Sequence, residues 1–460
     1  MPALHARTES RRHALHERAN RRVRSVVFTL LAAVVPVPRA AAQVSQTEAT
    51  VVRAVDARAD QAIALLERLV NINSGTMNLA GVREVGRVLA AELEQIEFRV
   101  ELTDGGGFAR AGHLVARNVP ANATGPHLLL IGHLDTVFEP GSPFQRFTRT
   151  SDSTATGPGV VDMKGGDVVM VEAMRALRAA GVLDRLRITI VMTGDEERSG
   201  SPLELSKQAI IEAAQQADIA IAFENGDSNP ATAVVARRGS IGWRLEVTGT
   251  PSHSSQLFQP AVGSGAIYEA ARILTAWHHA LAGEPDLTFN PGVIIGGTAV
   301  EYDALASAGT AFGKSNVVAE KTTVTGDLRS ISVEQLERAR ARMAFVAGQN
   351  LPGTAATLTF DEGYPPLSPT EGNYRMLELF DRVSRDLGSG PVTAVDPRNA
   401  GAADVSFTAG LVDMAIDGLG PGGGNDHTVD EWILLPTLAM QTKRAALLIL
   451  RLGTASTSAP

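Results

Sequence analysis

Short apolar runs alternate with longer amphipathic stretches through the first half of the chain. The runs at 127–132, 186–193 and 218–223 are continuous, a pattern typical of strands buried on both faces of a sheet. The stretches between them place apolar residues at helical spacing, which predicts helices over 165–180 and 202–216. Strands alternating with helices indicate an α/β fold, a mostly parallel sheet with helices on both faces.

The residues before these strands continue the pattern. We expect two helices, from Thr47 to Val70 and from about Leu79 to Ile96. Two short strands should follow, at 98–102 and 114–118, separated by the turn that contains Gly105–Gly107. These elements extend the same domain toward the N-terminus.

The pattern changes near residue 237, where strict alternation from Ser240 to Val247 predicts a strand with one solvated face. Further elements are then predicted in the order helix, strand, strand, helix, strand, at about 261–280, 293–300, 316–328, 333–349 and 356–360. Together these elements indicate a small α+β (βαββαβ) module with helices on one face.

After this module the earlier pattern returns, with a helix near 371–387, a strand at 412–416 and a closing helix from Leu435 to Leu452. We therefore predict a catalytic domain in two parts, 46–236 and 364–460, with an inserted lid or dimerisation domain at 237–363. Residues 1–42 form a separate N-terminal segment before the first part of the catalytic domain.

Residues 1–42 have the pattern of an export signal. A basic region with Arg21-Arg22 precedes an apolar run, 26–37, that is too short for an ordinary membrane span. Ala40–Ala42 supply a small-residue cleavage site, and the paired arginines suggest twin-arginine export. An uncleaved anchor and a misassigned start codon are the alternatives. We expect an exported protein, periplasmic or secreted, with no stable membrane span after the signal is removed.

Composition narrows the chemistry. The chain has 44% apolar and 20% charged residues, which is ordinary for a soluble globular protein. Its net charge of −8 gives no support for nucleic-acid binding. There is no cysteine, so a transition-metal site would have to use His, Asp and Glu, a ligand set that suits zinc, manganese or cobalt.

Acidic and histidine residues follow the predicted strands in glycine-rich context. They are His133, Asp135, Asp162, Asp195–Glu197, Glu224 and His427. Each alone has an ordinary explanation, such as a core histidine, a solvated turn or a helix cap. Because sites in open α/β sheets form beyond the carboxyl ends of strands, their joint occurrence indicates one metal site. His133 and Asp135 also share a face of an extended strand, so Asp135 can orient the imidazole.

Five stretches carry a family resemblance, which extends over nearly everything after the export segment. They read, in order, HLDT, GPGVVDMKGG, TGDEERSG, FENGD and GGGNDHTVDEW. As a set they resemble the co-catalytic dinuclear zinc exopeptidases, a family that includes glutamate carboxypeptidases, aminoacylases, acetylornithine deacetylase and succinyl-diaminopimelate desuccinylase.

The resemblance implies two divalent metal ions per subunit, with Zn²⁺ as the expected metal and Co²⁺ or Mn²⁺ as alternatives. By this similarity Asp162 bridges both ions, His133 and Glu224 complete one site, and Glu197 and His427 complete the other. Two ions sharing a carboxylate lower the pKa of a bridging water and polarise the scissile carbonyl.

The same resemblance implies the remaining catalytic roles. Glu196 is the general base, since an unligated carboxylate can accept a proton from water and deliver it to the leaving amine. Asp135 orients His133, and the peptide bond between Asp162 and Met163 is cis.

The inserted segment carries further residues that match the family. His253, in PSHSS, is implied to reach the partner subunit's site in a homodimer formed through the inserted domains, although its residue type alone favours a surface loop histidine. Asn316 and Arg329 match substrate-binding positions, and Lys314 is a further candidate. Tyr364 stands where the family's glutamate-releasing member has an arginine, and a phenol cannot form arginine's bidentate contact with a carboxylate.

These features predict a metal-dependent hydrolase that cleaves an amide next to a free carboxylate, most closely a glutamate-carboxypeptidase-like exopeptidase acting on small peptides. An N-acyl-amino-acid deacylase with the same metal centre is one alternative. A relative that only binds metal or peptide is another, but retention of Glu196 beside Glu197 argues against it, because such a protein would not need the base.

Overall fold

The computed structural model describes residues 44–304 and 306–454. The predicted export signal, residues 1–42, lies outside these described residues. Within them, no helix is both long and apolar enough to cross a bilayer.

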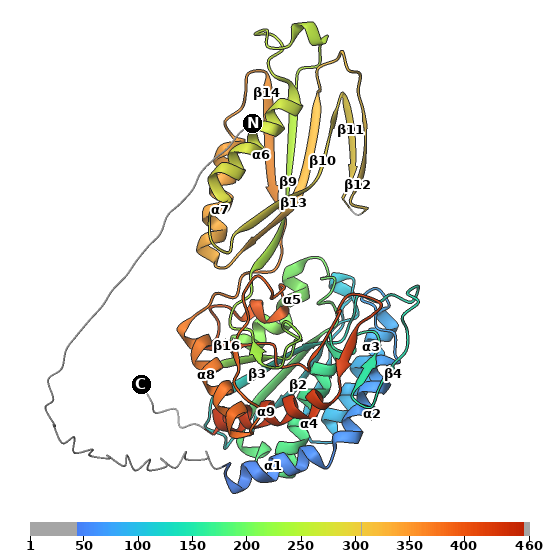
Figure 1. Cartoon of the computed structure of the whole chain (residues 1–460), viewed down its shortest axis with the longest axis vertical. Helices are drawn as coiled ribbons and strands as arrows, with labels where there is room; N and C mark the ends of the chain where they lie inside the picture. The colour runs from blue at the N-terminus through green and yellow to red at the C-terminus, as the bar shows by residue number, and fades with distance from the viewer. Residues whose placement is uncertain (1–43, 305, 455–460) are drawn as a thin grey trace, which may run out of the picture. The chain divides into compact units, whose positions relative to one another are not determined.

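A six-stranded sheet forms the centre of the larger α/β part (Figure 1). Its strands, in spatial order, are β1 (Arg99–Leu102), β2 (Leu114–Asn118), β6 (Arg187–Thr193), β3 (His127–His133), β7 (Ile219–Ala222) and β16 (Met414–Ile416). The pairs β6–β3, β3–β7 and β7–β16 are parallel, whereas β1 and β2 join antiparallel at one edge. The predicted mostly parallel sheet is therefore confirmed, with an antiparallel edge.

Helices cover both faces of this sheet. On one face Leu128 and Leu130 of β3 share a core with six helices, and on the other Leu129 and Ile131 share a core with α5. The six are α1 (Gln46–Asp56), α2 (Ala59–Val70), α3 (Leu79–Glu94), α4 (Lys164–Ala179), α8 (Glu371–Asp386) and α9 (Pro436–Gly453), and α5 spans Leu203–Ala214. Alternate residues of one strand thus serve two cores, which explains its continuous apolar run.

The single helix predicted over 47–70 is wrong, because the structure has two helices, α1 and α2, with a break at Ala57 and Arg58. Apolar spacing continues through the break, so periodicity gave no sign of it. A tertiary contact marks the position: Arg58 binds the buried carboxylate of Glu172 on α4 through two hydrogen bonds of 2.7 and 2.9 Å.

Residues 239–360 contain a second sheet, which is antiparallel and has its own core (Figure 1). Its order is β10 (Thr288–Gly297), β13 (Lys321–Ser330), β9 (Gly239–Gly249) and β14 (Thr354–Phe360). Helices α6 (Gly265–Leu281) and α7 (Val333–Ala347) share this core with alternate strand residues. Trp243 of β9 and Trp277 of α6 meet edge to face there, with ring centroids 5.2 Å apart.

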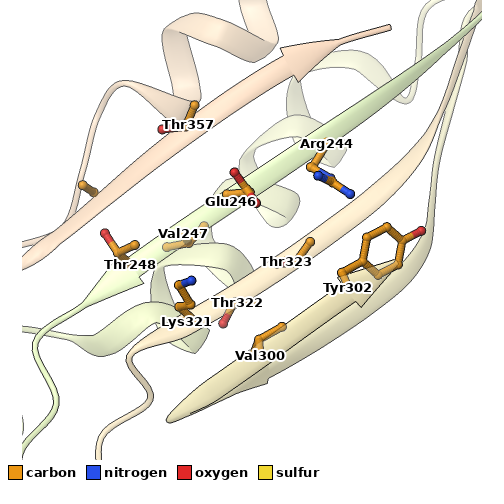
Figure 2. Close-up of a pocket in the computed structure, with 11 residues that line it drawn as sticks. Arg244, Glu246, Val247, Thr248, Val300, Tyr302, Lys321, Thr322, Thr323 and Thr357 are labelled. Atoms are coloured by element: carbon orange, nitrogen blue, oxygen red, sulfur yellow. The ribbon is translucent and has the colours of Figure 1, made fainter. Parts of the chain in front are cut away.

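A hairpin, β11 (Ala299–Asp303) and β12 (Ala308–Phe312), was not predicted and adds to this module. Apolar alternation is confined to Val300 and Tyr302 of β11, which are half-buried, whereas every residue of β12 is exposed. Figure 2 shows Tyr302 of the hairpin lining a pocket with Arg244 and Glu246 of β9. The Arg244 guanidinium lies 5.0 Å from the centroid of the Tyr302 ring.

The two chain segments that enter and leave the second sheet pair with each other. Antiparallel bridges join Arg237 to Leu367 and Ser240 to Tyr364. The amide of each residue in the second pair donates to the carbonyl of the other, at 2.9 and 3.0 Å. We call residues 237–240 and 364–367 the paired connectors.

The remaining elements are short. One small sheet has the order β17 (Gly423–Gly424), β18 (Trp432–Leu434), β5 (Thr154–Thr156) and β4 (Thr148–Arg149), and another pairs β8 (Thr232–Ala233) with β15 (Thr393–Ala394). The 3₁₀ helices are η1 (Gly106–Phe108), η2 (Leu183–Arg185), η3 (Ser254–Gln256) and η4 (Asp404–Thr408).

Candidate metal centre

The carboxyl ends of three adjacent parallel strands define the site. Strands β6, β3 and β7 are neighbours, and their ends lead into Glu196, His133 and Glu224 respectively. Because parallel strands end at the same edge of a sheet, side chains far apart in sequence meet there.

All five predicted metal ligands come together. His133 Nε2 lies 3.3 Å from Asp162 Oδ1 and 3.3 Å from Glu224 Oε1. His427 Nε2 lies 3.0 Å from Asp162 Oδ2 and 3.2 Å from Glu197 Oε2. Each oxygen of the Asp162 carboxylate thus faces a different histidine, with a different glutamate beside it.

The electrostatics of this cluster suit cations. Burial raises the pKa of Glu197 and of Glu224 to about 7, and the negative charge of Asp162 adds to both shifts. Hydrogen bonds to Asp162 and Glu197 raise the pKa of His427 to about 11. Burial raises the pKa of Asp162, but the two histidines outweigh it and hold that pKa below its ordinary value.

Unsatisfied polar atoms give a second test of the fit. The buried atoms His133 Nε2 and Glu197 Oε1 make no hydrogen bond within the described part of the chain. Groups of three potential ligand atoms lie within 4.8 Å of one another around both His133 and His427. The donor set of imidazoles and carboxylates therefore fits two divalent ions. Asp426, which was not predicted, belongs to the group with Asp162 and His427.

Buried carboxylates hold the loops that carry these ligands. Glu431 accepts hydrogen bonds from the amides of Gly159, Val161 and Asp162, at 3.0, 2.8 and 3.1 Å. It fixes the turn on which Asp162 lies. The Asp162–Met163 peptide is cis, which confirms the prediction.

The buried carboxylate of Asp135 holds the loop that carries Glu196 and Glu197, as Glu431 holds the turn that carries Asp162. Its two carboxylate oxygens accept the amides of Glu196 and Glu197 at 3.1 and 3.2 Å, and the hydroxyl of Thr76 at 2.6 Å. Nδ1 of His133 lies 3.1 Å from the main-chain oxygen of Asp135 and 3.4 Å from its carboxylate. The predicted contact between Asp135 and His133 is present, and the loop anchoring is an addition to it.

Asp417, which was not predicted, anchors the third strand end. It accepts the amide of Glu224 at 3.1 Å and pairs with the buried Arg237 guanidinium at 2.7 and 2.8 Å. Burial cannot be read from a single acidic residue, so neither Asp417 nor Glu431 stood out in the sequence. The weak signal was that Glu431 lies within the HTVDEW part of the last motif.

Glu196 is distinct from its neighbour Glu197. Its carboxylate lies with His133 and Glu224 and accepts no hydrogen bond among the described residues. Burial, reinforced by Glu224 and Asp404, raises its pKa well above the ordinary value. A carboxylate held in place but without a fixed partner can exchange a proton.

The predicted residues of the inserted segment lie on the second sheet module. His253 is exposed and bonds through Nδ1 to Ser255 at 2.8 Å, while the next residue, Ser254, donates to the main-chain oxygen of Asn316. Arg329 pairs with Asp327 at 2.9 Å, and Lys314 is exposed. No hydrogen bond or ion pair joins these residues to the metal cluster within the described ranges.

The fold and the site together define a class of protein. A parallel-centred α/β sheet places one carboxylate between two histidines, with further glutamates alongside, and this donor set is that of metal-dependent hydrolases.

Comparison with known families agrees. Residues 129–451 match Peptidase family M20/M25/M40, and the chain belongs to this family. The chain is therefore a hydrolase of amide bonds.

The chain is 27% identical over 393 residues to carboxypeptidase G2 of Pseudomonas sp. (strain RS-16), covering 85% of this chain and 89% of that protein. It is 26% identical over 396 residues to succinyl-diaminopimelate desuccinylase of Acidovorax ebreus, covering 81% and 93%. A solved structure of Bacillus subtilis YXEP protein, described as a dinuclear metal binding peptidase from the M20 family, superposes with a TM-score of 0.60 at 13% identity, covering 87% and 100%. That likeness supports the fold.

Proposed function

We propose that the protein is a metallo-exopeptidase that releases a C-terminal residue by cleaving the amide next to a free carboxylate. The observation that carries this proposal is the position of Asp162, whose two carboxylate oxygens face His133 and His427 separately. The Glu196 carboxylate lies nearby and has no hydrogen-bond partner among the described residues. Similarity to carboxypeptidase G2 over most of both chains supports a carboxypeptidase-like reaction.

We assign His133, Asp162 and Glu224 to one divalent ion and Asp162, Glu197 and His427 to a second, with zinc as the preferred metal because the donors are imidazole and carboxylate. When bound, such ions would supply Lewis-acid polarisation of the scissile carbonyl and a lowered pKa for water.

The chain's own residues divide the remaining work. Glu196 takes the proton of the attacking water and delivers it to the leaving amine. Asp135 keeps the amides of Glu196 and Glu197 in place while contacting the His133 ring, so ligand and base are positioned from one carboxylate.

We further propose a homodimer in which residues 237–363, the inserted domain, bring His253 to the partner's site. Exposed apolar side chains on this module, among them Ile267 and Tyr268 on α6 and Ile294 on β10, supply a surface for pairing. Asn316, Arg329 and Lys314 are the proposed substrate-binding residues. The amide of Ser254, the residue after His253, donates to the main-chain oxygen of Asn316 at 2.9 Å, which supports a shared location for His253 and Asn316.

Mixing two inactive variants tests the dimer. A Glu196→Gln chain and a His253→Ala chain should each lose most activity, and their mixed dimer should regain part of it, because one site then has both groups intact. If subunits exchange and no activity returns, His253 does not act across the interface.

Export through residues 1–42 is also proposed, and N-terminal sequencing of secreted protein checks cleavage after Ala42.

A second candidate function is the hydrolysis of N-acyl amino acids, which the similarity to succinyl-diaminopimelate desuccinylase favours. One assay separates the two. Zinc-loaded protein is incubated with dipeptides, longer peptides and N-acyl amino acids, with and without a chelator. Chelator-sensitive release of C-terminal residues supports the carboxypeptidase, whereas preference for acyl substrates supports the deacylase. Hydrolysis that continues at full rate after the metal is removed would refute both.

A further inference from the structure

The main chain of Glu196 is held at both of its polar groups by side chains from distant parts of the sequence. Its amide donates to Asp135 Oδ1 at 3.1 Å. Its carbonyl oxygen accepts the hydroxyl of Tyr364 at 2.9 Å. The Glu196 side chain, by contrast, has no hydrogen bond in the described chain, so its direction depends on the backbone from which it extends.

Tyr364 is itself held in a polar cluster beneath this loop. The single hydroxyl proton of Tyr364 has two acceptors, the Glu196 carbonyl at 2.9 Å and, farther away, Asp404 Oδ1 at 3.1 Å, and we assign it to the nearer one. The Tyr364 oxygen lies 3.3 Å from Ser199 Oγ, and the ring centroid is 5.1 Å from that of Phe407. Lys207 Nζ lies 3.0 Å from the same oxygen of Asp404 and 5.4 Å from the centroid of the Tyr364 ring. Lys207 is fully buried and Asp404 nearly so.

The same cluster fixes the residue before Glu196. Lys207 Nζ donates to the main-chain oxygen of Asp195 at 3.2 Å. The Asp195 carboxylate accepts the amide of Gly200 at 2.8 Å and the hydroxyl of Ser206 at 2.6 Å. The loop that carries the base is therefore braced from both ends, and Tyr364 provides the only side-chain hydrogen bond to the Glu196 carbonyl among the described residues.

The charge of the cluster explains why a phenol suits this position. Two carboxylates, Asp195 and Asp404, share one ammonium group, that of Lys207. A further carboxylate here would be repelled, and a neutral hydroxyl can donate a hydrogen bond without adding charge. Burial and the nearby acids raise the pKa of Tyr364 well above its ordinary value, so the hydroxyl keeps its proton.

We propose that Tyr364 is a positioning residue for Glu196: its hydroxyl holds the Glu196 carbonyl so that the carboxylate stays beside His133 and Glu224. This inference rests on the proposed function, in which Glu196 is the general base. Among the described residues, Tyr364 makes no hydrogen bond to a proposed metal ligand, and it acts through the backbone of the base. Since its hydroxyl is committed inside the protein, it is not a substitute for a substrate-binding arginine at this position.

The position of Tyr364 in the fold adds a second consequence. Tyr364 belongs to the paired connectors, where its main chain exchanges two hydrogen bonds with Ser240. The residue that braces the base is thus part of the segment by which the chain leaves the second sheet.

The test replaces Tyr364 by Phe, which removes one oxygen and keeps the ring against Phe407. We expect kcat to fall about tenfold to a hundredfold, because small misplacement of a catalytic group has effects of this size. KM should stay within about twofold, and metal content should equal that of the wild type, since no ligand is touched. The control is Tyr374→Phe on α8, an exposed tyrosine that should leave all three quantities unchanged.

A double variant distinguishes positioning from a general structural effect. If Tyr364 acts through Glu196, Tyr364→Phe should cost little further activity in a Glu196→Gln background, because the group that it positions is already gone. Additive losses would overturn the proposal. A wild-type kcat in Tyr364→Phe, a raised KM at unchanged kcat, or loss of metal would each overturn it as well.

Hydrogen exchange provides a readout that does not depend on activity. Amides of the peptide that spans residues 194–200 should exchange faster in Tyr364→Phe than in the wild type, with little change elsewhere. Unchanged exchange would overturn the positioning role. If metal-loaded wild-type protein hydrolysed none of the peptides or acyl amino acids, the proposed function would fail instead, and the exchange result would still decide whether Tyr364 braces this loop.

Discussion

The buried pair of Arg237 and Asp417 supports the Glu224 end of the metal centre, and its disruption has a predictable cost. Asp417 contacts the guanidinium through Oδ2, at 2.8 Å to Nε and 2.7 Å to Nη2, while Oδ1 accepts the amides of Glu224 and Gly418. Replacement by Asn leaves one side-chain oxygen to accept from both the Arg237 guanidinium and the two main-chain amides. Whichever way the amide turns, its NH₂ group faces a donor, and the Arg237 charge stays buried without a counter-charge.

Removing one partner of a buried ion pair costs about 3 to 5 kcal/mol. This range applies here because the side chains of Arg237 and Asp417 are only 4% and 0% exposed. We therefore expect Asp417→Asn to lower the free energy of unfolding by about 3 to 5 kcal/mol. Binding of the metal that we assign to Glu224 should also weaken, since the amide of Glu224 loses its acceptor.

The measurement is urea unfolding of chelator-treated protein, followed by far-ultraviolet circular dichroism, so that bound metal does not shift the midpoint. Asp413→Asn is the matched control, because Asp413 is exposed four residues away and undergoes the same change of charge. A second variant, Arg237→Met with Asp417→Asn, should recover part of the loss by removing the unpaired charge. A change below about 1 kcal/mol in Asp417→Asn would refute the reasoning.

Three further predictions concern other residues of the site and core. Glu196→Gln should keep both metals but lose about a hundredfold or more in turnover, because only proton transfer is removed. Glu197→Gln should instead reduce the metal content found by elemental analysis. Near-normal turnover in Glu196→Gln would exclude Glu196 as the base. Glu431→Gln should destabilise the metal-free protein by about 1.5 to 3 kcal/mol, because at least one of its three amide bonds is lost. The exposed neighbour Asp430, changed to Asn, is the control, and equal stability of the two variants would contradict the assignment. Burial lowers the pKa of His127, so on acidification the unfolded chain binds a proton at a higher pH than the folded chain does, and the free energy of unfolding should fall as pH drops below about 6.5. Urea titrations at pH 8 and 5.5 measure this fall, which should be smaller in His127→Asn. An equal fall in the variant and the wild type would contradict the prediction.

Much of the larger α/β part could be predicted because its signals are local. The continuous run at 127–132 becomes β3 at His127–His133, and the helix expected at 165–180 is found at Lys164–Ala179. The candidate ligands were predicted from their position after such strands, and the structure brings them into one cluster.

The features that were missed depend on contacts between distant residues. The break between α1 and α2 occurs where Arg58 reaches Glu172, 114 positions later in the chain. Strand β11 is only five residues long, although Val300 and Tyr302 alternate with exposed neighbours, and every residue of β12 is exposed, so neither strand gives a long apolar pattern. The anchoring acids Glu431 and Asp417 resemble ordinary surface carboxylates until the fold buries them.

The paired connectors have a consequence for how the chain could have acquired its second sheet. Because Ser240 and Tyr364 exchange two hydrogen bonds across an antiparallel bridge, their Cα atoms are separated by only about 5.5 Å. A turn of a few residues could close that gap, so the segment between them can be lost, gained or exchanged without rerouting the six-stranded sheet. Insertion at such a point leaves the two ends of the host chain adjacent. Folding of the inserted module brings its own two ends together, and this offsets the entropic cost of closing a long loop in the host domain.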